Sequence, residues 1–378
     1  YNMFNAADAS KWYAKAIETS QDSETYYRYA QMLKADGKYE ESNKQMQKFA
    51  SMSPSDSRAK AFKENPNYVP KLLNKTKQYN VNSSDISSDK SDFGPLLVEN
   101  TLYFTSARNG ARKNYGWNDE PYLDVYQADY NADGTITNAF PVSSINSKWH
   151  EGPVTLSADG NTMYFSSESF LENESEKVKE LKSKFSQIYL YRATKDGDSW
   201  SNKKPLPFNS KEYSCSNPSL SKDGKTLYFS SNMPNGMGGT DIWKVTVNAD
   251  DTYGTPENLG KNVNTEGNES FPFISDDNKM LYFASSGRQG LGGYDVFEYE
   301  LASSKEAVNM GTPINTDKDD FSFTFNSKKD VGFFASNRNG NDDIFKAIPV
   351  CGVDVLVVVT DAKTGAILAD TKVSILDE

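Results

Sequence analysis

Residue types common in catalytic and metal sites are scarce in this chain, which has one histidine, His150, and two cysteines, Cys215 and Cys351. Zinc sites and histidine-based acid/base sites usually need several imidazoles or a positioned partner. The cysteines are too far apart for a CxxC motif, and two separate free thiols are favoured over one disulfide. We therefore expect no metal, no cofactor and no histidine-based catalytic site.

Motifs of two hydrolase classes are also missing. A sialidase Asp box has a residue between Asp and Gly, whereas Asp159-Gly160 and Asp223-Gly224 are adjacent. A serine hydrolase needs Gly-x-Ser-x-Gly together with His and Asp partners, and this motif does not occur. The sequence predicts that the chain is not an enzyme.

Aspartates and arginines recur at fixed places in a longer repeat. The aspartates open short apolar segments such as Asp-Val-Tyr, and the arginines lie in Ser-x-Arg-x-Gly. A ring of ligands is one interpretation, but the constant position favours turn capping, in which each carboxylate accepts backbone N–H bonds. We expect the arginines to pair with these aspartates. The residues are Asp124, Asp241, Asp295, Asp343, Arg108, Arg288 and Arg338.

The repeat itself contains a Leu-Tyr-Phe-Ser-Ser block that occurs five times. A Pro-bearing segment and an Asp-Gly or Asp-Asn turn precede most copies, and an apolar third segment follows each. The pattern Ser-x-Asp-Gly-Lys-x-Leu-Tyr-Phe-Ser-Ser resembles the TolB-type, WD-like propeller repeat. The copies are Leu102–Ser106, Met163–Ser167, Leu227–Ser231, Leu281–Ser285 and Gly332–Ser336.

A fourth strand is expected after each third one, in segments that run from proline to Asn-Ser or Asn-Thr, such as Pro205–Ser210. The fifth copy precedes the first blade, near Tyr79–Ile86, where it can close the ring and remove two sheet edges. The sequence predicts a five-bladed β-propeller over 75–349, with six blades as the alternative. Residues Glu172–Lys184 interrupt the second blade as a solvated helix or a contact for a partner.

Residues 1–74 show apolar residues at helical spacing. The stretch Ser23–Pro54 resembles a tetratricopeptide repeat (TPR), with Ala30 and Leu33 at close-packing positions. Such an array has a concave face, on which Tyr26, Tyr27 and Gln31 are candidates for protein contact. The equal alternative is that the helices only pack against the next domain.

The charge balance excludes one class of partner. The net charge is −11, with 52 acidic and 41 basic side chains, and nucleic-acid binding requires clustered Lys and Arg. No window of about 18 apolar residues is present that could span a membrane as a helix.

The segment 350–378 contains Thr-Asp-x-x-Thr-Gly, which resembles the first strands of a carboxypeptidase-regulatory-like β-sandwich and stops before such a domain is complete. In this order, the three parts are similar to OmpA-family periplasmic proteins of the PorE type, from the type IX secretion and gliding machinery. The resemblance implies a periplasmic, outer-membrane-associated scaffold whose peptidoglycan-binding OmpA-like domain is absent from this chain. It implies an outer-membrane β-barrel of the PorP or SprF type as partner.

Two functions remain in view at this point. The first is a non-catalytic scaffold that links an outer-membrane complex to the cell wall through protein contacts of the propeller and the helices. The alternative is a propeller that binds a small ligand or a glycan in its central channel.

Overall fold

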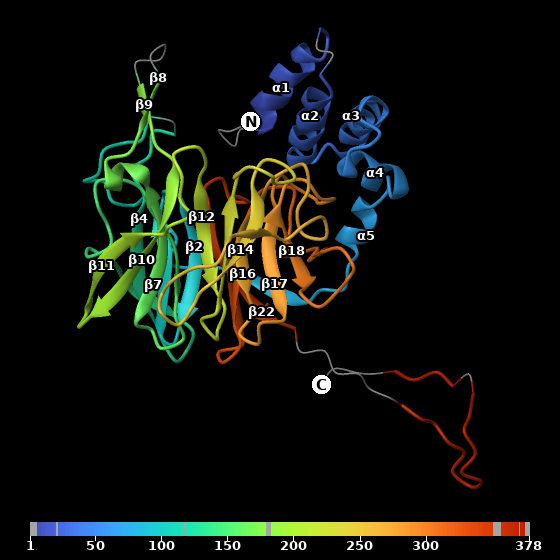
Figure 1. The fold of residues 1–378 in the computed structure, drawn as a ribbon. Coiled ribbons are helices and arrows are strands. Elements are labelled where there is room, and N and C mark those ends of the chain that lie inside the picture. Colours follow the sequence, from blue (N-terminus) through green and yellow to red (C-terminus); the bar gives the residue numbers. More distant parts are fainter. Residues whose placement is uncertain are drawn as a thin grey trace.

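In the described part of the chain, five four-stranded antiparallel sheets surround a central axis, and helices from the N-terminal part lie over one end of them (Figure 1). This computed structural model describes residues 6–19, 22–116, 118–178, 183–350, 357–369 and 371–374. The five-bladed propeller predicted from the repeat is confirmed, and the alternative of six blades is wrong. Helices α1–α4, between Ala6 and Glu64, and the hairpin of β8 (Glu176–Val178) and β9 (Ser183–Phe185) rise from the same end of the propeller, which we call the helix end (Figure 1).

Each blade runs outward from an inner strand at the axis. Blade 1 contains β2 (Asp92–Val98), β3 (Thr101–Ser106), β4 (Asp124–Tyr130) and β5 (Ile136–Pro141). Blade 2 contains β6 (Glu151–Leu156), β7 (Thr162–Glu168), β10 (Ile188–Asp196) and β11 (Ser199–Pro205). Blade 3 contains β12 (Cys215–Leu220), β13 (Thr226–Ser231), β14 (Asp241–Thr246) and β15 (Glu257–Asn258). Blade 4 contains β16 (Glu269–Ile274), β17 (Met280–Ser285), β18 (Asp295–Glu300) and β19 (Val308–Asn309).

The fifth blade closes the ring with a strand from before blade 1. Its strands are β20 (Asp320–Asn326), β21 (Val331–Ser336), β22 (Asp343–Pro349) and β1 (Tyr79–Ser83), and β1 pairs antiparallel with β22. The Tyr79 ring lies 5.7 Å from Phe323 and 6.3 Å from Phe325 between centroids. The closing strand predicted near Tyr79–Ile86 is confirmed.

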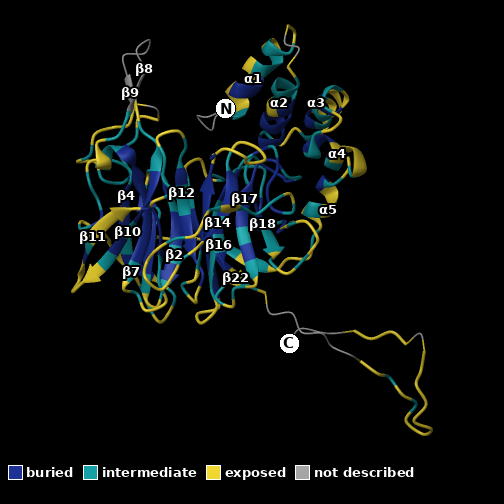
Figure 2. Ribbon diagram, viewed as in Figure 1, coloured by how far each residue is buried: buried dark blue, intermediate teal, exposed yellow. Residues whose placement is uncertain are grey.

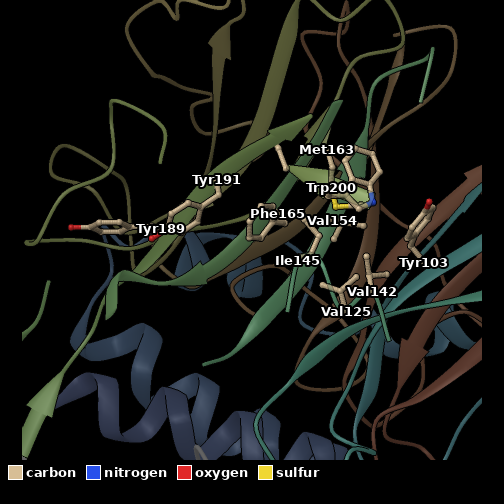
Figure 3. Packing of buried hydrophobic residues seen from close by; sticks show 11 residues of the cluster. Tyr103, Val125, Val142, Ile145, Val154, Met163, Phe165, Tyr189, Tyr191 and Trp200 are labelled. Carbon is tan, nitrogen blue, oxygen red and sulfur yellow. The ribbon is translucent and has the colours of Figure 1, made fainter. Parts of the chain in front are cut away.

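The recurring apolar block explains how blades stack. On β7, Met163 and Phe165 face blade 1, while Tyr164 faces blade 3, because successive side chains on a strand alternate between its faces. Figure 3 shows the resulting cluster between blades 1 and 2, where Phe165 stacks on Tyr191 at 5.4 Å. Both faces of each blade are therefore buried, as the dark strands of Figure 2 show.

Every inner strand contains a bulge where it skips a pairing with the second strand. One residue there has positive φ, and four of the five are Gly, Asn or Ser, which tolerate it more readily than bulky residues. At Gly152, φ is +105° and a Cβ would lie 2.2 Å from Thr105 Oγ1. The five residues are Gly94, Gly152, Asn217, Phe271 and Ser322.

The fourth strands differ from the predicted segments. Strand β15 lies within its predicted segment, Pro256–Thr265, and β19 ends before the segment predicted for it. Strands β5 and β11 end at the proline that opens the predicted segment, Pro141 and Pro205. The Pro-to-Asn segments are mainly loops that cross to the next blade. Proline cannot donate to a ladder, so it ends these outer strands instead of continuing them.

The N-terminal helices are α1 (Ala6–Ala16), α2 (Ser23–Ala35), α3 (Tyr39–Met52), α4 (Ser57–Glu64) and α5 (Val69–Leu73). Asp22 caps α2 by accepting from the backbone N–H of Glu24 and Thr25. Helices α2 and α3 pack as a pair, with the Ser42 hydroxyl donating to the Ala30 carbonyl at 2.8 Å. Their assignment to the TPR class, and the domain limits 1–74, 75–349 and 350–378, stay predictions.

Two further segments were predicted. In the insertion, η1 (Ser169–Glu172) is followed by β8 (Glu176–Val178) paired with β9 (Ser183–Phe185). The described part is a hairpin, so the alternative of a solvated helix is wrong, and the alternative of a partner contact stays a prediction. In the C-terminal segment, Thr360 and Ile367 form an isolated bridge. The rest of the expected β-sandwich start, 351–356, 370 and 375–378, lies outside the described residues.

Replacing Tyr79 by alanine tests the ring closure. Loss of its contacts with Phe323 and Phe325 is expected to lower the free energy of unfolding by about 2–4 kcal/mol. Urea unfolding followed by tryptophan fluorescence measures this. Phe140→Ala, at a side chain 46% exposed, is the control and changes stability by less than about 0.5 kcal/mol. Equal effects of the two substitutions would contradict the closing role of β1.

Candidate functional site

A polar link joins each blade to the next at the helix end. At the end of a blade an Asn side chain pairs with the third strand, as Asn264 does with Ile242 N (2.8 Å) and O (3.0 Å). Thr265 then donates its backbone N–H and its hydroxyl to the Glu269 carboxylate, at 2.8 and 2.7 Å. Glu269 opens the inner strand of the next blade and is fully buried. We call this Asn-Thr-carboxylate arrangement the blade link.

In four of the five inter-blade loops, an Asp or Glu lies four residues after a Ser or Thr and accepts hydrogen bonds from it. The fifth has Cys215 in the acid's place, bonded to the Ser231 hydroxyl at 3.5 Å. Sequence reasoning missed the acids, although the spacing Ser/Thr-x-x-x-Asp/Glu was visible. The pairs are Ser88 with Asp92, Ser147 with Glu151, Thr265 with Glu269, and Thr316 with Asp320.

Two kinds of environment surround these acids. Burial raises the pKa of Glu151 and of Glu269 to about 7, although hydroxyl and backbone donors oppose the shift. Asp92 and Asp320 instead form ion pairs, with Arg108 at 2.7 Å and with Arg338. The links of blades 2 and 4 therefore titrate near neutrality without a cationic partner in contact.

The expected pairing of the arginines with third-strand aspartates is wrong. Arg108 and Arg338 reach the first residue of the inner strand, and Arg288 contacts Glu306 at 3.1 Å and two backbone carbonyls. Arg108 and Arg338 follow the second strands of their blades in sequence, and their guanidinium groups lie beside the first residue of the inner strand. Asp124 pairs with Arg112, which the sequence analysis did not single out.

The third-strand aspartates lie at loop ends. Asp295 accepts the backbone N–H of Leu291 (2.8 Å) and of Gly292 (3.0 Å). Asp241 accepts from Met237 N and, at 3.0 Å, from Asn258 Nδ2. Asp343, which opens β22, is half-buried. The bonds of Asp241 and Asp295 have the geometry that turn capping requires.

The residues proposed for outside contact on the helices face inward instead. Tyr27 and Gln31 are buried, and the Tyr27 hydroxyl donates to the Ser286 carbonyl of blade 4 at 2.6 Å. Tyr26 is half-buried and donates to Ile17 O at 3.4 Å. The expectation is wrong for Tyr27 and Gln31 because α2 lies directly on the propeller.

A cavity of about 450 Å³ opens at the helix end of the channel; we call it the mouth cavity. Its floor is formed by Phe93, Phe271 and Phe321 from the inner strands of blades 1, 4 and 5. Their centroids lie 4.9–6.2 Å apart, so the rings meet at the axis. Phe271 holds its ring there with φ +54°, a conformation that costs an L-residue about 1–2 kcal/mol.

Carboxylates and amides surround this aromatic floor. Glu120, Asp319 and Asp342 line the cavity together with Asn337 and Asn341. Burial, with the charges of Asp319 and Glu120, raises the pKa of Asp342 to about 7. Burial also raises the pKa of Asp319, whose oxygens accept from Tyr294 N at 2.7 Å and from Asn337 Nδ2 at 3.2 Å. Three carboxyl groups therefore lie at the channel entrance, where a nearby cation would favour their ionised forms.

A second cavity of about 330 Å³ adjoins the first between the helices and blades 3–5; we call it the seam cavity. Met32 and Ala35 of α2 form one wall. Thr240, Asn268, Ser270 and Ser286 are on the other. The two cavities share Tyr294, Asp319 and Asn337.

The single histidine, His150, packs in an aromatic cluster next to the mouth cavity. His150 Nδ1 accepts from Leu123 N at 3.0 Å, and its ring lies 4.4 Å from Tyr122 and 4.7 Å from Tyr115. Burial lowers the pKa of His150 to about 4, so it is neutral at pH 7. Cys215 is buried and free, and Cys351 lies outside the described residues.

The described part of the chain contains neither a metal-binding cluster nor a membrane-spanning helix. No group of three or more His, Cys, Asp or Glu side chains there is arranged to hold a metal ion. No helix there is long and apolar enough to cross a membrane.

Comparisons with known proteins find structural similarity only. No family model and no curated protein matches the chain. A TolB structure from Acinetobacter baumannii is 14% identical, with TM-score 0.41, over 75% of this chain and 57% of that one. An α-L-arabinofuranosidase from Lactobacillus brevis is 11% identical, with TM-score 0.42, over 82% and 99%. A puromycin-hydrolyzing peptidase from Mycobacterium tuberculosis is 10% identical, with TM-score 0.38, over 77% and 48%.

These matches correct the expectation that the chain is not an enzyme. Hydrolases are among the solved structures that resemble this propeller, so its repeat does not separate enzymes from binding proteins. The motif argument covered histidine and serine machinery, whereas glycoside hydrolysis can proceed with two carboxyl groups alone. At such low identity the similarity assigns no activity.

The raised pKa values of the blade-link acids predict a pH dependence of stability. Because Glu151 and Glu269 have a pKa of about 7 in the fold and about 4.3 when unfolded, the folded state binds more protons between these values. The free energy of unfolding should therefore fall as pH rises from about 5 to 8.

Urea unfolding at both pH values tests this with the double variant Glu151→Gln and Glu269→Gln, in which the fall becomes smaller. Glu300→Gln, at an exposed position, keeps the wild-type dependence. An unchanged pH dependence in the double variant would show that these carboxyls are ionised in the folded state throughout the range.

Proposed function

We propose that the chain is a protein-interaction scaffold whose helices and propeller act as one rigid body and bind partners at the helix end. The observation that carries this proposal is the polar seam between the helices and blades 4 and 5. In such a seam both parts are fixed relative to each other, so that a partner meets one preorganised surface.

Hydrogen bonds from the helices and from the propeller loops form the seam. Ser57 of α4 donates its backbone N–H to Glu266 at 2.9 Å, and Tyr68 donates to Gly290 O at 3.1 Å. From the propeller, Lys318 Nζ donates to Ala35 O at 2.8 Å, at the last residue of α2. Gln289 donates to the Ala61 carbonyl of α4 at 3.1 Å.

Charged groups are buried in the same seam. Lys34 of α2 is 4% exposed, and burial lowers its pKa to about 8, while Asp295 and Asp319 act in the opposite direction. Burial raises the pKa of Asp295 to about 7. A buried charge loses its hydration and needs nearby opposite charges to compensate it. Undocking the helices would separate Lys34 from the carboxylates that do so, which favours the docked arrangement.

The location and partners are part of the same proposal. The TolB-like repeat and the order of the three segments support a periplasmic, outer-membrane-associated protein of the type IX secretion or gliding machinery. Its partner would be an outer-membrane β-barrel of the PorP or SprF type, with peptidoglycan bound only through an OmpA-like domain.

In this proposal Asp124, Asp241, Asp295 and Asp343 have a structural role, in which each carboxylate caps a turn.

Ligand binding deep in the channel is supported less well. Below the phenylalanine floor the inner strands line one pocket of about 30 Å³ and, at the opposite end of the channel, one of about 120 Å³, both smaller than the cavities at the helix end.

Exposed apolar side chains at the helix end provide the test. Trp12 of α1 is 70% exposed and Phe185 of β9 is 48% exposed, and large apolar anchors dominate protein interfaces. Tagged protein extracted from native membranes in mild detergent should copurify an outer-membrane β-barrel in near-equal amount. The double variant Trp12→Ala and Phe185→Ala should recover at least about fivefold less of it.

Val308→Ala is the matched control, because Val308 is 52% exposed on the outer strand β19. It should leave recovery unchanged. Copurification of no membrane protein at all, or equal recovery by all three proteins, would contradict the proposed function.

A further inference from the structure

We propose that the mouth and seam cavities together bind an extended peptide segment of the partner, with a lysine or arginine side chain placed over the phenylalanine floor. The inference rests on the proposed scaffold function and names the kind of segment that the helix end would take. It is argued from the shape, the lining and the charge of the two cavities.

The shape fits a chain segment. The cavities share Tyr294, Asp319 and Asn337, so a depression leads from helix α2 to the propeller axis. Their volumes, about 330 and 450 Å³, each lie within the range of small-ligand sites. One cavity holds a few backbone units while the other holds a long side chain.

The seam cavity has the lining that a peptide backbone needs. Thr240, Asn268, Ser270 and Ser286 carry both donors and acceptors, and Met32 and Ala35 oppose them as an apolar wall. An extended peptide has alternating N–H and C=O groups that such a polar wall can pair. Its side chains on the other face would contact the apolar wall of α2.

The mouth cavity has the charge that a basic side chain needs. Glu120, Asp319 and Asp342 contribute carboxylates. None of the described residues that line this cavity is Lys or Arg. Of the nearby cations, Lys34 is buried under α2 beside Asp319, and Lys318 lines the seam cavity and is bonded to Ala35 O at 2.8 Å and to Asp317 at 3.3 Å. A cationic head would meet these carboxylates, and its methylene stem would lie on Phe93 and Phe271.

A peptide is favoured over a small free amine because the depression continues past the carboxylates. A lone amine would use only the mouth cavity and leave the hydroxyl and amide wall unused. A neutral glycan would gain nothing from the three carboxylates as charges. Both are outcomes that the following measurement separates.

The test uses ligand-observed NMR titration of the 378-residue chain with capped pentapeptides. The probes are acetyl-Gly-Ala-Lys-Ala-Gly-amide, the same peptide with norleucine or glutamate in place of lysine, acetyl-lysine-amide, and chitobiose. The lysine peptide should bind at least tenfold more tightly than each of the others. Equal binding of the norleucine peptide, acetyl-lysine-amide or chitobiose would overturn the proposal.

Two variants assign the binding to these cavities. Asp342→Asn removes one carboxylate and should weaken the lysine peptide about tenfold, and Ala35→Met should weaken it by filling the seam cavity without changing charge. Asp276→Asn, which lines a separate pocket with the other ends of the inner strands, should have no effect. If Asp342→Asn fails to fold, Ala35→Met and the peptide series still decide.

The failure of this inference is distinct from failure of the scaffold function. The wild type and Asp342→Asn could copurify the membrane partner equally well while the wild type binds all pentapeptides alike. That result would support the scaffold function and overturn the peptide site.

Discussion

A buried acid at the start of the inner strand, held by the Ser or Thr four residues earlier, is the interaction on which most of this propeller depends. It fixes the loop that leaves one blade to the strand that begins the next, at four of the five junctions. The preceding side chain completes the link by pairing with the third strand; it is Asn at three of these junctions and Ser87 at the fourth. These links add directional, buried bonds to the nondirectional packing of the five apolar gaps between blades.

The same links shape the helix end. Because the inner strands begin there, the acids, the second-to-third-strand loops and the helices all gather at one mouth of the channel (Figure 1). The helices occupy the side of blades 4 and 5, and the aromatic cluster around His150 with the β8–β9 hairpin occupies the side of blades 1 and 2. What stays open between them is the depression formed by the mouth and seam cavities.

The sequence predicted the structure best where a repeated pattern of residue types has one physical cause. The Leu-Tyr-Phe block alternates because both faces of each blade are buried, so its five copies predicted the blades, and the unpaired copy near Tyr79 predicted the closure. The Arg108 and Arg338 partners were missed, although Asp92 and Asp320 each lie four residues after Ser or Thr and directly before Phe. A spacing of 16 or 18 residues along the chain does not show that the end of the second strand returns beside the start of the inner strand. Tyr27 and Gln31 were assigned to a free surface because a helical pattern shows which face is apolar and not what covers it. The mouth cavity arises from loops of blades 1 and 5, which are neighbours only after the ring has closed.

The most direct test of binding at the helix end is photo-crosslinking in living cells, with a short benzophenone side chain placed at Asn341 on the mouth or at Lys328 beside the opposite pocket. Our account predicts a discrete crosslinked partner from position 341 and none from position 328. A partner captured only from position 328 would contradict it and place the binding surface at the other end of the propeller.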